Sequence, residues 1–545
     1  MKPNIWLSQR AQPPHGFLRL ALSFGLLVTI ALVGYLAFFF PIHEDEVGWK
    51  LMLTRFWRDN GSSVNYMASC AHDFSVAIPK ALYPAAILEA WLYQNLLNIH
   101  KLRIFGMISV SIWGLLLLLI WNRIQGASKN TSAGFGLLFL GYLPIGLFMN
   151  RPEQTLLLSL TLMIALPLFK TKNKWEEHAV FLCFFLAANA LFFHHLKGLF
   201  FLPLVLAAIW FLKISTSLRV MMGVASVTAA ASSYLFYSHK NQCPMDPDFL
   251  AWMKSNMLSP SDFIQQPLQS IVACIRNLYR WTAYIHSALF IDNFYEAKMP
   301  SWPPLAFLVN AVNKLIKLLI FFWLFRWLLD VAGVLKARQN RWRQDYPLIA
   351  SLGLFVAVVA MALVQGRKNF YESHLVLPIL VIMGVLIGGR GLPVARWFVW
   401  LDRVFVRAIF FAVVTSITLL ALQLIPATKT AWLQELQFQG SRAGVWISSF
   451  GLKEREKRVY TLAQRCGIQD GPQTQHLVID ELTYPYFAKT KEPFFRVVTG
   501  THPEKLAEIM RRANSPGFIG QCQYLPLHYL SQAERIDNLC CISRF

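Results

Sequence analysis

The chain contains few charged residues, and acidic residues are especially scarce. Only 15% of its 545 residues are charged, whereas a soluble globular protein carries about 25%. Together with 55% hydrophobic residues and a mean hydropathy of +0.43, this excludes a soluble protein and indicates a polytopic membrane protein. The 51 Lys and Arg outnumber the 29 Asp and Glu. They form short clusters between apolar segments, as the positive-inside rule requires, so we expect no nucleic-acid partner.

Several motifs are also missing. The eight cysteines include no Cys-x-x-Cys pair, which argues against a redox centre or a structural metal site. No internal repeat is visible, and the charges lie at the ends of apolar segments, which disfavours a secondary transporter. The first apolar stretch, 16–41, is longer than the roughly 7–15 residues of a cleavable signal, so we expect a permanent anchor.

Apolar windows of about 17–25 residues predict the membrane spans. Lys2, Arg10 and Arg19 precede the first span, so the N-terminus is expected in the cytoplasm. The basic residues of the later loops then alternate consistently with this orientation. The predicted spans, eleven by this criterion, are 17–40, 104–122, 132–149, 154–169, 178–194, 198–213, 219–238, 304–327, 347–365, 375–392 and 407–425.

The same topology divides the chain into a transmembrane module, 1–425, and a C-terminal segment, 426–545. The module has two large outer loops, 41–103 and 239–303, and amphipathic stretches in both are expected to lie as interfacial helices. The C-terminal segment is more polar, and its alternating apolar runs predict a small periplasmic α/β domain. Disulfides are permitted there, but their connectivity cannot be read from the sequence.

An acidic run, Glu44-Asp45-Glu46, follows the first span directly. Three carboxylates cannot lie in hydrocarbon, so the run marks a negative site at the outer membrane surface. The simpler interpretation is that these acids cap a helix beginning near Val47, which is worth about 0.3–1 kcal/mol. One acid would suffice for that, so we interpret Asp45 as a catalytic base, Glu46 as its helper and Glu44 as the weakest candidate. With His43 the run also offers ligands for a divalent cation such as Mg or Mn, although its spacing is not diagnostic.

Three further polar clusters lie at outer span ends, around residues 150–153, 194–198 and 366–374. Carboxylates together with Arg, Lys and His at headgroup depth indicate a site for a lipid-linked phosphate beside a general base. Each cluster also has a simpler interpretation. Arg151 and Glu153 form only an ion pair at a tight turn, and His194 is an interfacial residue with its hydrogen bonds satisfied. The lysines contact the headgroups of bulk lipid. The candidates for phosphate binding are Arg151, His194, His195, Lys197, Arg367 and Lys368, and those for substrate contact are Glu153, Tyr371, Glu372 and His374.

Four short motifs occur in an order that resembles the GT-C superfamily of membrane glycosyltransferases, which includes protein O-mannosyltransferases and the lipid A aminoarabinose transferase. They are Asp45-Glu46-Val47-Gly48, Arg151-Pro152-Glu153, His195-Leu196-Lys197-Gly198-Leu199, and Asn369-Phe370-Tyr371-Glu372 with the later Leu377-Pro378. Leu196 stands where the superfamily motif has proline. The resemblance covers the membrane module. The C-terminal segment matches no branch, so the acceptor stays open.

The resemblance implies an α-helical, GT-C-like enzyme of the bacterial inner membrane, acting at its periplasmic face. It would transfer a hexosyl or pentosyl group from a polyprenyl-phosphate donor to a glycan, lipid or protein acceptor, with inversion. Asp45 would deprotonate the acceptor hydroxyl, a contribution of about 10²–10⁴-fold, and fixed cations would stabilise the leaving phosphate. A secondary transporter or a non-catalytic envelope-assembly protein remains the alternative.

Overall fold

The computed structural model of the chain describes most of the membrane module and parts of the C-terminal segment. The described residues are 30–40, 42–43, 46–47, 80–96, 99–125, 131–240, 256–285, 303–338, 343–366, 368, 370–388, 396–434, 438–440, 444–447, 451–468, 477–480, 483, 486, 494–496, 503–512, 515 and 517–543.

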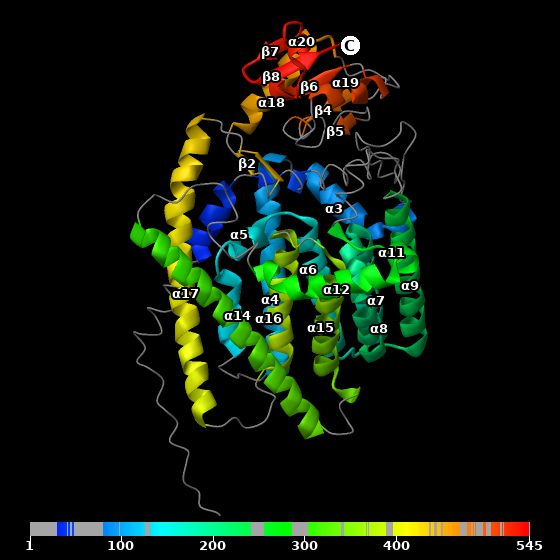
Figure 1. Cartoon of the computed structure of the whole chain (residues 1–545). Coiled ribbons are helices and arrows are strands. Elements are labelled where there is room, and N and C mark those ends of the chain that lie inside the picture. Colours follow the sequence, from blue (N-terminus) through cyan, green and yellow to red (C-terminus); the bar gives the residue numbers. More distant parts are fainter. Residues whose placement is uncertain are drawn as a thin grey trace, which may run out of the picture.

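Six described helices are long and apolar enough to cross a membrane, which makes the chain a multi-pass membrane protein. They run side by side, with α14 oblique to the others (Figure 1). Each overlaps one of the expected spans, although α14 and α17 extend well beyond the expected ends. Their bounds are α4 (Leu102–Gln125), α7 (Lys174–His194), α9 (Thr216–Lys240), α14 (Pro303–Arg338), α15 (Tyr346–Val364) and α17 (Arg396–Gln434).

Shorter apolar helices occupy four more of the expected spans, so the total of eleven stays a prediction. The remaining span, 132–149, differs from the single helix expected there. It is a 3-10 helix and a short α-helix separated by a turn at Gly141, whose φ of 53° lies in the left-handed region that suits glycine. The elements are Ile30–Phe39, η3 (Thr131–Phe139), α5 (Leu143–Phe148), α6 (Pro152–Ala165), η4 (Leu166–Leu168), η5 (Leu196–Phe201), α8 (Leu202–Phe211) and α16 (Phe370–Ile387).

The centre of the bundle is α16. Every side chain described in this helix, from Ser373 to Ile387, is buried, and the helix packs against α4, α6, α14 and α15. A helix that is apolar on all sides must be surrounded by other elements. This explains why the lipid-facing side chains belong to the outer helices instead, as at Leu115 of α4 and Phe410 of α17.

The outer loops carry short helices: η1 (Lys80–Leu82), α3 (Pro84–Asn95), η2 (Ile99–Lys101), α11 (Pro260–Gln265), α12 (Pro267–Tyr279) and η6 (Arg280–Thr282). Helix α12 runs across the bundle rather than along it (Figure 1). Its buried Ser270 and Asn277 mark the face toward α15, and Asn277 Nδ2 donates to the Leu363 carbonyl at 3.0 Å.

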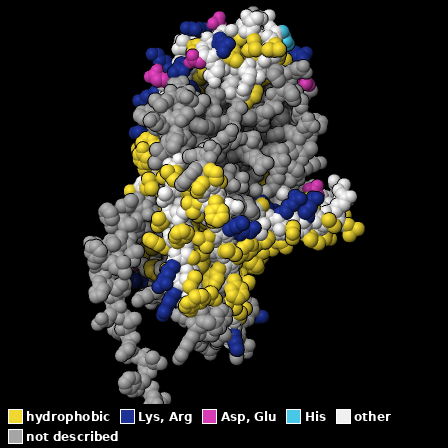
Figure 2. Space-filling model, turned by 60° about the vertical axis from the view of Figure 1, so that its left-hand side comes forward, with side chains coloured by type: hydrophobic (Ala, Val, Ile, Leu, Met, Phe, Trp, Pro, Cys, Tyr) yellow, Lys and Arg dark blue, Asp and Glu magenta, His cyan; other side chains and the backbone are white. Residues whose placement is uncertain are grey.

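The other face of α12 is apolar and exposed. Leu268, Val272 and Ile275 are 78%, 65% and 65% exposed, one or two helical turns apart. Figure 2 shows a projecting ledge with hydrophobic side chains along its underside and basic side chains above them. This is the amphipathic pattern typical of a helix lying at a membrane surface, and the interfacial placement expected for this part of the chain stays a prediction.

Two small sheets lie above the bundle (Figure 1), and the C-terminal segment supplies all of their strands except β1 (Ile42–His43). In the first, β1, β3 (Gly444–Ile447) and β2 (Phe438–Gly440) pair antiparallel in the order β1-β3-β2. The second has the order β5-β4-β6-β8-β7, with parallel pairing at β4 and antiparallel pairing at β8. Its strands are β4 (Leu477–Ile479), β5 (Phe494–Arg496), β6 (Phe518–Gln521), β7 (Glu534–Ile536) and β8 (Leu539–Ile542).

Helices lie on both faces of the larger sheet. Alternate strand residues face α18 (Leu452–Arg465) on one side and α19 (Pro503–Arg512) on the other. Two disulfides attach neighbouring elements to β8. Cys466–Cys541 connects the end of α18 to it, and Cys522–Cys540, on the α19 face, connects η9 (Cys522–Tyr524) to it. The short elements η9 and α20 (Leu527–Leu530) complete the described part.

The orientation of α12 generates a prediction. In a protein whose Cys183 and Cys274 are replaced by Ser, a spin label at Ile275 should collide more often with lipid-soluble oxygen than with a water-soluble nickel chelate. A label at the neighbouring Arg276 should show the reverse order, because it projects about 100° around the helix. The measurement is electron paramagnetic resonance of the protein in nanodiscs. Equal accessibilities at the two positions would contradict the interfacial placement.

Candidate active site

The hinge between α5 and α6 carries two of the predicted site residues. Met149, which ends α5, and Arg151, the N-cap of α6, have extended backbones, and Pro152 occupies the first position of α6. Proline suits that position because its missing N–H has no partner in the first turn anyway. Glu153 follows in the same turn, where a carboxylate interacts favourably with the helix dipole. The local sequence therefore explains why the chain turns here.

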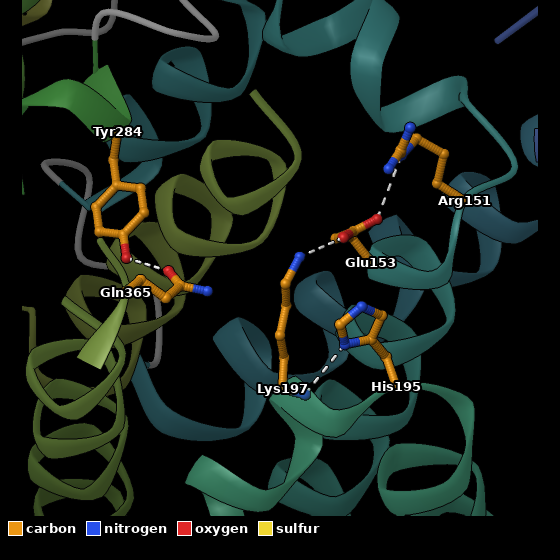
Figure 3. Close-up of polar contacts among 6 residues, drawn as sticks. All are labelled: Arg151, Glu153, His195, Lys197, Tyr284 and Gln365. Carbon is orange, nitrogen blue, oxygen red and sulfur yellow. Dashed lines mark hydrogen bonds and ion pairs between the residues drawn. The ribbon is translucent and has the colours of Figure 1, made fainter. Parts of the chain in front are cut away.

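Glu153 lies between two basic side chains. Lys197 Nζ is 2.6 Å from Glu153 Oε1, and Arg151 Nε is 3.3 Å from Glu153 Oε2 (Figure 3). All three side chains are buried, with exposures of 3–6% for the residues. Buried charges need partners, and one carboxylate here serves two cations. The three charged groups therefore lie together in a region shielded from water.

Lys197 is positioned by the turn between α7 and η5. The ring Nδ1 of His195 accepts from the Lys197 backbone N–H at 3.1 Å and so caps η5. Gly198 comes next, and a Cβ atom at this position would lie 1.9 Å from the Leu191 carbonyl oxygen. Only glycine fits so close to another backbone. The His-Leu-Lys-Gly order is thus needed for the turn as well as for the charge.

Glu46, from the acidic run, is connected to this hinge. It is fully buried, and Oε1 lies 2.9 Å from Arg103 Nη2 at the start of α4. Oε2 accepts from the Asn150 backbone N–H at 3.0 Å. Arg103 Nη2 also lies 3.4 Å from the Phe40 carbonyl oxygen. These contacts hold the end of the first apolar helix, α4 and the hinge together.

A second polar cluster faces Lys197 across the site (Figure 3). The Tyr284 hydroxyl donates to Gln365 Oε1, and Lys368 Nζ donates to the Gln365 carbonyl at 2.6 Å. Lys368 Nζ also lies 5.5 Å from the centre of the Tyr284 ring, a cation–π distance. Met257 forms a bridge with Gln365, so the second outer loop is fastened to the end of α15.

The two predicted histidines outside this cluster have separate surroundings. His194 Nδ1 lies 2.7 Å from the Tyr83 hydroxyl and 4.0 Å from Glu89 Oε2 of α3. Burial raises the pKa of the Tyr83 hydroxyl well above its usual value, so this hydroxyl keeps its proton beside His194. His374 of α16 is buried against α5, where a Cβ atom at Gly146 would lie 2.0 Å from its Nε2.

The structure therefore brings together Arg151, Glu153, His195 and Lys197 and connects Glu46 to them through Asn150. Lys368 belongs to the facing cluster. His194 contacts α3 instead, and His374 lies beneath α5. Glu44, Asp45 and Arg367 lie outside the described residues, as do the side chains of Tyr371 and Glu372, whose backbones belong to α16. The roles assigned to all of these residues stay predictions.

The sequence analysis did not single out four residues that shape the site: Arg103, Tyr83, Tyr284 and Gln365. Arg103 carried a usable signal, because an arginine at the first turn of an apolar span requires a partner. The other three are polar residues at helix or loop ends, and nothing in the sequence distinguishes them. Among the described residues, no three His, Cys, Asp or Glu side chains gather as metal ligands. A divalent cation at the acidic run stays a prediction.

Comparisons with known proteins give distant similarities. No protein-family model and no curated protein matches the chain. Among solved structures, the oligosaccharyltransferase of Archaeoglobus fulgidus in its apo form is 10% identical, with a TM-score of 0.39 over 91% of this chain and 69% of that one. ArnT from Cupriavidus metallidurans bound to undecaprenyl phosphate is 12% identical, with a TM-score of 0.38 over 97% and 98%. ArnT in its apo state gives 12% and 0.36 over 97% of each chain.

At 10–12% identity and TM-scores below 0.4, the likeness is distant. The functional conclusion therefore depends on the geometry of the site.

The buried Glu153 cluster generates a prediction about stability. Glu153→Gln removes the carboxylate that both Lys197 and Arg151 contact, and removal of one partner from a buried ion pair costs about 3–5 kcal/mol. Lys197→Met in the same chain should recover a large part of that loss. A double-mutant cycle of denaturant unfolding in detergent measures the coupling. Additive effects of the two substitutions would show that the pair contributes nothing.

Proposed function

We propose that the chain is an integral membrane glycosyltransferase that uses a sugar linked to polyprenyl phosphate. The observation that supports this best is the hydrogen bond from the Asn150 N–H to Glu46 Oε2. It connects the acidic run to the hinge that carries Arg151 and Glu153. A general base and a set of phosphate-binding cations must lie close together in such an enzyme, and this contact connects the segments that carry them.

The charge of the cluster fits a lipid-linked phosphate. Arg151 and Lys197 both contact the carboxylate of Glu153, so two basic side chains lie together in a buried region. Cations in such a region attract an anion far more strongly than they would in water. Lysine and arginine each carry several N–H donors, so we infer that both side chains keep donors for a phosphate beside their contacts with Glu153.

In the proposed reaction, Asp45 accepts the proton of the acceptor hydroxyl. The hydroxyl oxygen attacks the anomeric carbon, and the bond from that carbon to the phosphate oxygen breaks. The released polyprenyl phosphate carries the electron pair of that bond, and Lys197 and Arg151 stabilise its charge. A single in-line displacement inverts the anomeric configuration. Glu46, whose two oxygens contact Arg103 and Asn150, positions the segment next to Asp45.

We infer that the reaction takes place at the outer, periplasmic face of a bacterial inner membrane. Strand β1, which directly precedes the acidic run, pairs with β3 of the C-terminal segment. That segment contains two disulfides. Disulfides form in oxidising compartments outside the cytoplasm. The acceptor is a cell-envelope glycan, lipid or protein, and the transferred group is a hexosyl or pentosyl sugar.

The proposed base gives a direct test. Asp45→Asn should lower the rate of sugar transfer from a polyprenyl-phosphate donor by about 10²–10⁴-fold, because the amide cannot accept the proton. Transfer is measured with purified protein in nanodiscs and a radiolabelled donor. Glu454→Gln, on the exposed side of α18, is the matched control and should keep wild-type rates. Unchanged transfer by Asp45→Asn would exclude Asp45 as the base, and a wild-type protein inactive with every polyprenyl donor would exclude the proposed function.

The proposed phosphate site gives a second test, with different outcomes expected for two side chains in contact. Lys197→Met removes a cation and should weaken binding of undecaprenyl phosphate by roughly tenfold or more, as loss of a charged contact does. Glu153→Gln removes the competing carboxylate and should not weaken it. Dissociation constants are measured by titration calorimetry in detergent. Equal losses of affinity in the two variants would indicate damage to the fold instead of a phosphate site.

A further inference from the structure

A hydrophobic cluster joins the C-terminal α/β segment to the outer surface of the membrane module. From the module it contains Ile42, Val47, Tyr93 and Leu102, which are between 0% and 5% exposed. From the C-terminal segment it contains residues of α18 and of the larger sheet, among them Leu452, Val459, Leu462, Leu477, Ile479, Ile519 and Cys541. These parts therefore share one core, which contains Ile42 from before the acidic run and Val47 from after it.

Only one face of the larger sheet takes part in this core. Leu477 and Ile479 of β4 face α18 and the module, whereas Val478 between them faces α19. The α19 face has its own core, which includes Met510 and, among the described residues, none from the module. The larger sheet thus packs with the described module residues through its α18 face, and its α19 face forms a separate core. This asymmetry provides matched positions for an experiment.

The backbone makes a second connection at the same place. Ile42 pairs with Ile447 and His43 with Trp446, in the antiparallel ladder between β1 and β3. Strand β3 lies in the middle of its sheet, because β2 pairs with its other edge. His100 of the module also lies 3.6 Å from Glu456 of α18. Chain segments some 400 residues apart therefore meet just before the acidic run.

On its other side the acidic run is held by the module. Glu46 is fully buried between Arg103 and the Asn150 N–H. Asp45 is the residue before Glu46 in the chain, and consecutive Cα atoms are about 3.8 Å apart. The segment that carries Asp45 thus has one anchor on the C-terminal segment, at residues 42–43, and one on the membrane bundle, at residues 46–47.

We propose that the C-terminal domain is a positioning element for the active site, which holds the acidic run in place through the β1–β3 pairing and the shared core. This inference rests on the proposed function for its catalytic consequence. Ile42 and the domain residues that pair with it are positioning residues, since they act through Asp45 and not on the substrate. Misplacement of a reacting group by about 1 Å costs on the order of 10²-fold in rate.

The pairing itself is tested by cross-linking in the full-length protein, and this test does not require activity. The I42C/I447C variant should form a disulfide, because the two Cα atoms are partners in the antiparallel ladder. The I42C/V445C variant should form much less of it, since Val445 pairs with Gln439 of β2. Peptide mass spectrometry distinguishes these links from the native disulfides. Equal cross-linking in the two variants, or none in I42C/I447C, would overturn the proposal.

The catalytic consequence is tested by kinetics. Ile42→Ala should lower kcat by roughly 10- to 100-fold, with KM for the lipid donor unchanged within about twofold, because the phosphate-binding cations lie on α6 and η5. Met510→Ala, a comparable truncation in the α19 core, should keep kcat. The oxidised I42C/I447C variant should retain kcat, whereas I42C/I447S, which cannot form the cross-link, should lose it. Unchanged kcat in Ile42→Ala, or equal loss in Met510→Ala, would overturn the proposal.

Failure of the proposed function gives a different result from failure of this inference. If the wild-type protein transfers no sugar, hydrogen–deuterium exchange of residues 42–47 decides the coupling by itself. Trp446→Pro removes a ladder N–H from β3 and should cause a loss of protection in this segment. Protection that persists in Trp446→Pro would overturn the positioning role, whatever reaction the protein carries out.

Discussion

A buried carboxylate must be compensated by charge and hydrogen bonds, and Glu46 is the carboxylate on which the rest of this structure depends. It is fully buried, and its two oxygens contact Arg103 of α4 and the Asn150 N–H of the hinge. Loss of either partner would remove part of this compensation in a region of low dielectric constant. One side chain thereby connects the first outer segment, a membrane helix and the hinge before α6.

The hinge transmits this constraint to the cation cluster. Arg151 and Glu153 belong to the same turn as Asn150, and Lys197 reaches Glu153 from another helix pair. The packing around α5 leaves little freedom, since a Cβ atom at Gly106 would lie 2.0 Å from the Phe148 carbonyl oxygen. The charged groups are therefore arranged by backbone contacts of the bundle. Such preorganisation is what electrostatic stabilisation of a leaving phosphate requires.

The bundle and the C-terminal segment make different contributions to the candidate site. The bundle holds cations in a buried cluster, and the C-terminal segment completes a core around residues 42–47. The short strand β1 could not be stable alone, because two residues bury little surface and form few hydrogen bonds. Its conformation depends on β3 and α18, which lie at the far end of the sequence. The arrangement gives the extramembrane domain a physical connection to the proposed chemistry.

The sequence by itself determined the class of the molecule, because hydropathy over about 20 residues reports directly on membrane insertion. It predicted the six long apolar helices and the polar hinge at residues 150–153 from local patterns. Only the tertiary structure decided which charges pair. Lys197 meets Glu153 rather than bulk lipid, Glu46 is buried, and Ile42 pairs with Ile447. Partners so far apart in the chain are selected by packing and desolvation, which no local pattern contains.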